Sequence, residues 1–105
     1  MSKFMIAYYG GEKPTSKEEG MAHMGKWKEW VTSLGDKVIN PGTPLMNSKL
    51  VTSNDVTDDK GSNTMNGFAI ITAEDMDSAL AIAKEDPFLQ MNGTIRVSEM
   101  MEMND

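Results

Sequence analysis

Lys3-Phe-Met-Ile-Ala-Tyr-Tyr9 and Gly67-Phe-Ala-Ile-Ile-Thr72 are two short runs that are apolar on both faces of an extended chain. Successive side chains of a strand point to opposite faces of the sheet. In the first run one face therefore holds Phe4, Ile6 and Tyr8, and the other holds Met5, Ala7 and Tyr9. Strands that are apolar on both faces are typical of the middle of a sheet. We predict that the two runs are its adjacent central strands.

The elements around these runs predict the fold class. Strands are expected at Lys37–Asn40 and Thr94–Met100, and helices at Ser16–Leu34 and at about Asp75–Glu85. Lys49–Ser53 and Asp55–Thr57 match the arms of a small hairpin or an irregular excursion. Ser16 and Glu19 match a capping box, and Pro87 marks the end of the second helix. With right-handed crossovers, the order β-α-β-β-α-β predicts an α+β, ferredoxin-like sandwich with an extra hairpin and a four-stranded antiparallel sheet.

The predicted sheet has one face that the chain itself leaves uncovered. Two helices cover only one face of a four-stranded sheet, whereas both central strands are apolar on the other face as well. A second copy of the chain is the simplest cover, because most oligomers are symmetric and two-fold dimers are the commonest. We therefore expect a homodimer that packs through the open sheet face.

Length and composition limit the domain organisation and the partners. The 105 residues fit one domain, residues 1–105. Sixteen acidic against ten basic residues give a net charge of −6, so a nucleic acid is not an expected partner. The absence of cysteine excludes disulfides, thiolate catalysis and Cys-based zinc sites. No stretch approaches the roughly 20 apolar residues that span a bilayer, and no secretory signal is evident. We expect a cytoplasmic protein without a membrane partner.

The single histidine, His23, lies on the expected apolar stripe of the first helix. At 100° per residue, an arc of about 120° contains the following side chains: His23, Met24, Trp27, Trp30, Val31 and Leu34. A group that titrates near neutrality thus lies in or beside the apolar face, which makes His23 the candidate for chemistry. The alternative is a structural imidazole that bonds to a backbone carbonyl.

A series of short motifs follows the predicted elements in order. The motifs are Tyr8-Tyr9-Gly10-Gly11, His23 with Trp27 and Trp30, Gly42-Thr43-Pro44-Leu45, Asn66-Gly-Phe-Ala-Ile-Ile71, Asp77-Ser-Ala-Leu80 with Ala83, Asp86-Pro87-Phe88, and Gly93-Thr-Ile-Arg-Val97. In this order and spacing they resemble the YCII-related (DGPF-type) domain proteins of the dimeric α+β barrel superfamily, over essentially the whole chain. The Asp-Gly-Pro-Phe motif of the commoner branch is absent, and Asp59-Lys-Gly-Ser-Asn-Thr64 stands in its place.

The resemblance implies a candidate active site, because a His-Asp pair is the proposed active site of that family. By motif, its histidine corresponds to His23 and its aspartate to Asp86. A carboxylate at the end of the second helix would oppose the helix dipole and favour a nearby cation. A contact with Asp86 would fix the tautomer of His23 and favour its imidazolium form. His23 would then act as general acid or base, with Asp86 orienting it. Asp-Pro is also a common helix-ending step without chemistry.

Other side chains are candidates for substrate binding. Tyr8 or Tyr9 would supply a phenolic hydrogen bond, and Trp27 and Trp30 an apolar wall for a small unsaturated or aromatic ligand. The alternative for both tryptophans is core packing. Arg96 would clamp a carboxylate, unless it is an ordinary exposed arginine of an edge strand. One histidine without a calcium-type loop predicts no metal site, and no dinucleotide or phosphate fingerprint is present, so no cofactor is expected.

Two functions remain open on these residues. The first is a cofactor-free enzyme that carries out His-assisted proton transfer on a small organic molecule, as in isomerisation, elimination or dehalogenation. The second is a non-catalytic dimeric module that binds a metabolite or docks onto a partner enzyme through the same pocket. They differ in what His23 does: an imidazole that titrates in a solvent-reachable pocket and responds to Asp86→Asn indicates the enzyme, and a fully buried imidazole bonded to the backbone indicates the module. If no pocket reaches His23, the chain is a purely structural subunit.

Overall fold

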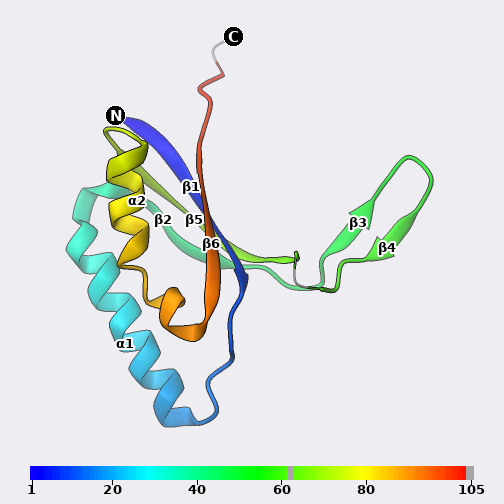
Figure 1. The fold of residues 1–105 in the computed structure, drawn as a ribbon, viewed down its shortest axis with the longest axis horizontal. Helices are drawn as coiled ribbons and strands as arrows, with labels where there is room; N and C mark the ends of the chain where they lie inside the picture. Colours follow the sequence, from blue (N-terminus) through cyan, green and yellow to red (C-terminus); the bar gives the residue numbers. More distant parts are fainter. Residues whose placement is uncertain (62, 104–105) are drawn as a thin grey trace.

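The computed structural model describes residues 1–61 and 63–103, and Figure 1 shows how its elements follow one another. Their bounds are β1 (Ser2–Gly10), α1 (Lys17–Leu34), η1 (Gly35–Lys37), β2 (Val38–Pro44), β3 (Lys49–Val51), β4 (Val56–Asp58), β5 (Met65–Ala73), α2 (Met76–Lys84), η2 (Pro87–Met91) and β6 (Gly93–Glu99). The labels η mark short 3₁₀ helices. Ser62, in the loop that replaces the Asp-Gly-Pro-Phe motif, lies outside the described residues.

Four strands form one antiparallel sheet in the order β2-β5-β1-β6. The central strands β1 and β5 pair with Phe4 opposite Ile71 and Ile6 opposite Ala69. These four side chains are almost completely buried and form the centre of the core together with Trp30 and Ala79. The ferredoxin-like α+β fold predicted from the order of the elements is confirmed.

Strand β2 is longer and less regular than its sequence suggests. It extends to Pro44 and shifts register against β5 between Asn40 and Thr43. Pro41 and Pro44 cannot donate to a ladder, but an edge strand tolerates proline because one of its sides pairs with no other strand. The irregular end of β2 turns the backbone around Gly42, whose φ is 151°.

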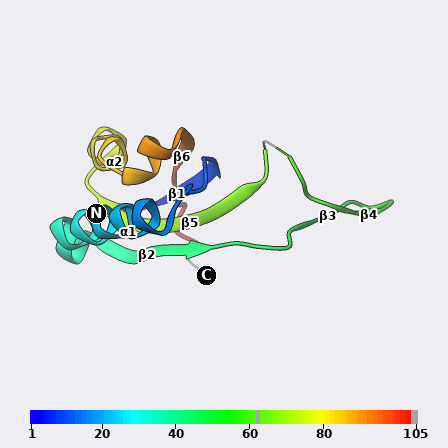
Figure 2. The ribbon, with the colours of Figure 1, turned by 90° about the horizontal axis from the view of Figure 1, so that it is seen from below.

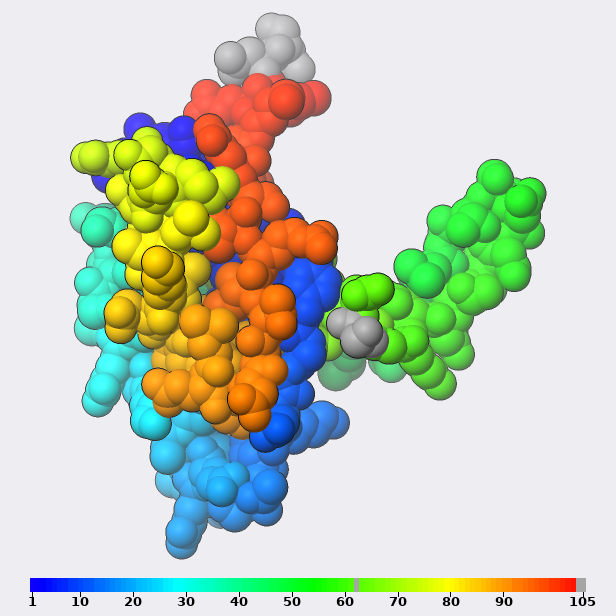
Figure 3. Space-filling model, in the orientation of Figure 1, coloured from blue at the N-terminus to red at the C-terminus, as the bar shows by residue number. Residues whose placement is uncertain are grey.

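Both helices cover the same face of the sheet, and the other face is open (Figures 1 and 2). Half-buried apolar side chains of the central strands lie on this open face, among them Met5, Phe68 and Ile70. The β3–β4 hairpin projects on the open side and stands clear of the body in the space-filling view (Figure 3). Among the described residues, neither helix is both long and apolar enough to cross a bilayer.

Helix α1 begins at a side-chain cap and ends at a glycine. Ser16 accepts a hydrogen bond from the backbone N–H of Glu19 at 3.1 Å, as the capping-box pattern predicts. The carboxylate of Glu19 turns to Thr15 instead of Ser16, and accepts from both its backbone N–H and its hydroxyl. Gly35 ends the helix with a φ of 56°. These ends hold His23 and Trp27 along the sheet-facing side of the helix.

Candidate active site

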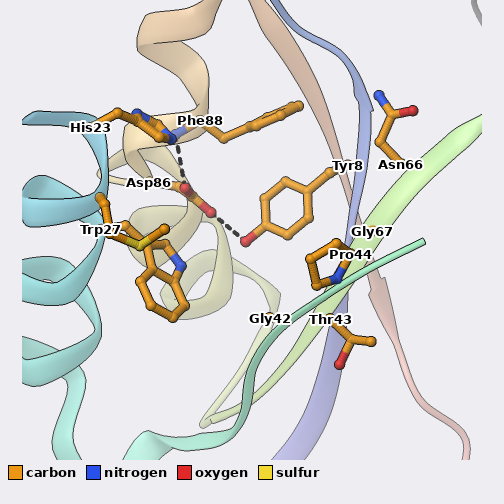
Figure 4. Close-up of a pocket in the computed structure, with 11 residues that line it drawn as sticks. Tyr8, His23, Trp27, Gly42, Thr43, Pro44, Asn66, Gly67, Asp86 and Phe88 are labelled. Atoms are coloured by element: carbon orange, nitrogen blue, oxygen red, sulfur yellow. Dashed lines mark hydrogen bonds between the residues drawn. The ribbon is translucent and has the colours of Figure 1, made fainter. Parts of the chain in front are cut away.

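A cavity of ≈ 360 Å³ opens between α1, η2 and the adjoining ends of β2 and β5 (Figure 4). Its volume lies in the range of small-molecule sites. Most of its lining is apolar or backbone, and the lining residues are Tyr8, His23, Met24, Trp27, Gly42, Thr43, Pro44, Asn66, Gly67, Asp86 and Phe88. None of them is a lysine or an arginine, so only His23 can carry a positive charge in the cavity wall.

Asp86 is the buried carboxylate of this cavity, with 3% of its surface exposed. Helix α2 ends two residues earlier, at Lys84, and Asp86 caps the start of η2 with Pro87 as its first residue. Its Oδ1 accepts a hydrogen bond from the backbone N–H of Phe88 at 2.9 Å. We expected this carboxylate to oppose the end of a helix dipole, whereas it satisfies donors at the start of the next helical turn.

Tyr8 holds the other oxygen of the carboxylate. Its hydroxyl donates a hydrogen bond to Oδ2 of Asp86 at 2.5 Å, and Figure 4 shows the two groups pointing toward each other. Tyr8 lies on the helix-facing side of β1, between Gly67 of β5 and Ile95 of β6. The central strand of the sheet therefore fixes one end of the contact, and η2 fixes the other.

Burial dominates the protonation equilibria of this pair. Desolvation raises the pKa of Asp86, although the hydrogen bonds from Tyr8 and Phe88 and the nearby charge of His23 act in the opposite direction. Burial and the bond to Asp86 raise the pKa of the Tyr8 phenol well above its ordinary value. Tyr8 is therefore a neutral donor at physiological pH.

His23 reaches the same cavity from α1 and is half-buried. It lies close enough to Asp86 for its charge to lower the pKa of that carboxyl group. Among the described residues, however, the hydrogen bonds of Asp86 come from Tyr8 and Phe88, and none joins it to His23. The imidazole is thus beside the carboxylate, with its ring nitrogens available to a ligand or a water.

Two glycines form a slot for the ring of Phe88. A Cβ atom on Gly93 would lie 2.1 Å from the ring, and one on Gly11 would lie 3.0 Å from it. The ring also meets Tyr8 edge to face, with centroids 4.9 Å apart and an interplanar angle of 65°. Because Phe88 follows Asp86 by two residues, this slot fixes the position of the buried carboxylate.

Four of the residues proposed from the sequence come together in the cavity: Tyr8, His23, Trp27 and Asp86. The other three do not reach it. Trp30 is 7% exposed in the core, where its indole N–H donates to the carbonyl of Ile82 at 3.3 Å. Tyr9 and Arg96 lie on the opposite face of the sheet, where the guanidinium of Arg96 is 5.2 Å from the centre of the Tyr9 ring. Adjacent residues of a strand face opposite ways, which separates Tyr9 from Tyr8.

No site role was predicted from the sequence for the remaining walls of the cavity, although most of these residues lie in the quoted motifs. Phe88 directly follows the Asp-Pro step. Asp86 before Pro87 also fits the start of a helical turn, and this signal would have placed Phe88 beside the carboxylate. Gly42, Thr43 and Pro44 lie where β2 loses its register, for which the Pro-Gly pair was the available signal. Among the described residues, no group of three His, Cys, Asp or Glu side chains is arranged to hold a metal ion.

The fold and the cavity can be compared with known proteins. The model of the YCII-related domain matches residues 1–104. The chain belongs to this family. No curated protein sequence is significantly similar to it.

One solved structure that resembles this YCII-related chain is the 5-chloro-2-hydroxyhydroquinone dehydrochlorinase (TftG) from Burkholderia phenoliruptrix AC1100, in complex with 2,5-dihydroxybenzoquinone. The TM-score is 0.59 at 19% sequence identity, and the match covers 96% of this chain and 95% of the other. At this identity the similarity shows a shared fold over nearly the full length of both chains.

Proposed function

We propose that this YCII-related protein is a cofactor-free enzyme that transfers a proton on a small, flat organic molecule. His23 acts as the general acid or base, and the nearby charge of Asp86 stabilises the positive charge that the imidazole gains when it takes up a proton. The observation that carries the proposal is that the only histidine of the chain and a buried, doubly hydrogen-bonded carboxylate line one apolar cavity. A positioned imidazole of this kind contributes about 10²- to 10⁴-fold in rate.

The ligand class follows from the walls of the cavity. Trp27, Phe88 and Tyr8 offer aromatic surfaces, and Pro44 adds an apolar edge. Such walls suit a planar, unsaturated ring, because both apolar faces of the ring are then removed from water. The dehydrochlorinase of the same fold binds a dihydroxybenzoquinone, which supports a ring of this size. Elimination, isomerisation and dehalogenation are the reactions that one acid–base residue supports on such a ring.

Activity of the His23→Gln variant tests the proposal. With 5-chloro-2-hydroxyhydroquinone as the first substrate, chloride release by the wild type is expected, and the variant should lose about 10²-fold or more of the rate. Lys28→Gln, an exposed change on the same helix, is the matched control and should retain the rate. Full activity of His23→Gln would contradict the proposal.

A binding module without turnover is the second candidate. It is favoured by the position of His23, which makes no hydrogen bond to Asp86 among the described residues. Saturable binding of the same compound in the cavity, without chloride release or any other product, would support this function instead.

We also propose a homodimer that packs through the open sheet face. Met5, Phe68 and Ile70 supply apolar surface there, and a second copy would remove it from water. The β3–β4 hairpin projects on the same side, with Leu50 and Val51 respectively 51% and 75% exposed. An isolated two-stranded hairpin is marginally stable in water, so contact with a second copy would stabilise it. A cytoplasmic location remains an expectation from the composition.

A further inference from the structure

We infer that the cavity selects neutral molecules that carry a hydroxyl donor, phenols or enols, and that Tyr8 makes this selection by accepting the hydrogen bond of that hydroxyl. The inference rests on the proposed role of the cavity in binding a small ring. It adds to that role the chemical class of the ligand, and it assigns Tyr8 as a specificity-determining residue. His23 would then face the opposite part of the same ligand.

The argument begins with the hydrogen atom of the Tyr8 hydroxyl. A phenol has one donor hydrogen and lone pairs that accept. The hydrogen of Tyr8 is donated to Oδ2 of Asp86 at 2.5 Å, in a bond to a buried carboxylate. Bonds to ionised groups are about twice as strong as neutral ones. A ligand that needs a donor from Tyr8 would have to break this bond, so Tyr8 offers the cavity an acceptor.

The position of Tyr8 is fixed on both sides. Its ring packs edge to face on Phe88, and Phe88 is held in turn between Gly11 and Gly93. Its backbone pairs with both neighbouring strands of the sheet. A hydroxyl that cannot turn away from Asp86 keeps its lone pairs in one direction, and a ligand donor must match that direction.

The charges of the cavity exclude anionic ligands. A carboxylate or phosphate would approach the Asp86 carboxylate and find only His23 as a counter-charge. Arg96, the one arginine of the chain, lies on the other face of the sheet beside Tyr9. A buried charge without a paired partner is costly, so a neutral hydroxyl suits this cavity better than an acid.

Two of the other polar side chains in the cavity wall, Trp27 and His23, define the control ligands and the control variant. The indole nitrogen of Trp27 lies near Gly42 in the cavity wall, and its N–H can donate to any ligand oxygen. An aryl methyl ether therefore keeps this bond but has no hydrogen to give Tyr8. His23 can also accept a hydrogen bond from the ligand hydroxyl, so a His23 variant shows whether His23 or Tyr8 is the acceptor.

The experiment compares 2-naphthol, 2-methoxynaphthalene and 2-naphthoate as ligands of the wild-type protein. Binding is followed by the NMR signals of the two indole N–H groups, since Trp27 lines the cavity and Trp30 bonds to Ile82 in the core. We expect 2-naphthol to bind about tenfold more tightly than the ether, the effect of one hydrogen bond. Naphthoate should bind more weakly than the naphthol, and the Trp27 signal should shift more than that of Trp30.

Variants of the two tyrosines assign the acceptor. Tyr8→Phe alone would free Oδ2 of Asp86 to accept the ligand hydroxyl, so it is combined with Asp86→Leu. The double variant should reduce the naphthol-to-ether preference to about one, whereas Tyr9→Phe, on the other sheet face, should keep it. His23→Gln should also keep it. Equal affinity for naphthol and ether in the wild type, no binding of either, or a preference that survives the double variant would overturn the inference. So would a preference lost in His23→Gln.

Two further results keep the test decisive. If the double variant fails to fold, Overhauser contacts between the hydroxyl-bearing ring of 2-naphthol and the Tyr8 ring are measured in the wild type instead. Their absence would overturn the inference. The readout is binding and does not depend on turnover. If His23→Gln is active and still prefers 2-naphthol to the ether, the proposed catalytic role of His23 is wrong and the role of Tyr8 stands. If His23→Gln is inactive and has lost this preference, the role of Tyr8 is wrong and the catalytic role of His23 stands.

Discussion

The buried carboxylate of Asp86 has no lysine or arginine near it in the cavity wall, and neutral donors hold it in place. Tyr8 and the backbone of Phe88 give it two hydrogen bonds, and His23 supplies a weaker, longer-range attraction. Together they do not offset the loss of water, so the pKa of Asp86 stays above its ordinary value. A residue of this kind costs stability when it is ionised, and such a cost is typical of functional sites.

Asp86→Asn should therefore change how stability depends on pH. The raised pKa means that the folded protein holds the proton more tightly than the unfolded chain does. The stabilisation is complete below the unfolded pKa of about 3.9 and is lost as pH rises through the higher folded value. The variant does not titrate, so its stability relative to the wild type should rise with pH over that range. Urea unfolding at a series of pH values measures the difference.

Asp36→Asn is the matched control for this measurement. Asp36 is exposed in η1, far from the cavity, and should give the wild-type profile. A wild type that gains stability relative to Asp86→Asn between pH 4 and 7 would show that the hydrogen bonds and His23 outweigh burial, contrary to the expectation.

At the scale of residues, the sequence singled out four side chains that line the candidate cavity, but not the hydrogen bonds that hold them. The helical spacing placed His23 and Trp27 on one stripe, and the family resemblance added Asp86. The bond between Tyr8 and Asp86 was not foreseen, because the two residues are far apart in the chain and the packing of η2 against β6 and α1 brings them together. Trp30 lies on the same stripe but nearer the core, a difference that periodicity does not resolve.

Among the elements, η2 determines the geometry of the site. It has only five residues, and the Phe88 ring anchors it between Gly11 and Gly93. Both glycines are in segments that sequence patterns assign to turns. Here their small size matters as much as their flexibility, because a side chain on Gly93 would occupy the place of the ring.

Gly93→Ala should destabilise the protein by about 1–3 kcal/mol, the usual cost of overpacking. The added Cβ would lie 2.1 Å from the ring of Phe88, so the ring must leave its slot and η2 must shift with it. The Trp27 indole signal should move as well, because Asp86 and Phe88 share the cavity with Trp27. Thermal unfolding and the NMR spectrum measure the two effects.

Gly25→Ala is the control, and it should raise the stability of the protein where Gly93→Ala lowers it. Gly25 is exposed on α1 with no atom in reach of an added Cβ, so alanine should stabilise the helix by roughly 0.5–1 kcal/mol. Equal effects of the two substitutions would show that Phe88 moves aside without cost and that the slot does not hold η2.

The elements themselves were largely predictable, and their ends were not. Period-two and helical patterns predicted the strands and helices of the main layers in order, because each of these elements buries at least one apolar face. The β3–β4 hairpin is exposed throughout, and turn residues, not burial, indicated a hairpin or an irregular excursion there. Helix α2 ends at Lys84 and not at Glu85, since Asp86 begins a new turn. Strand β2 continues through Pro41, which local propensity disfavours but an unpaired edge permits.

On the scale of the whole molecule, the asymmetry of the two sheet faces is the dominant feature. One face carries both helices, and the hairpin projects on the other side (Figures 1 and 2). Half-buried apolar side chains of β1 and β5 lie on this open face. The sequence predicted an open apolar face. It did not predict that the hairpin extends on that side, because no local pattern fixes the direction in which a hairpin leaves a sheet.

Ile70→Lys should convert the proposed dimer to a monomer. Ile70 lies on β5 at the middle of the open face, half-buried beside the pairing strand β1, where its partner is Met5. A lysine there would place an unpaired charge in an interface that excludes water, at a cost of several kcal/mol. Light scattering coupled to gel filtration should give twice the chain mass for the wild type and one chain mass for the variant. Met21→Lys, 66% exposed on α1, should remain a dimer. The cavity lies on the helix side of the sheet, so the monomeric variant should still bind 2-naphthol. A wild type that is monomeric at micromolar concentration would contradict the proposed dimer but not the proposed site.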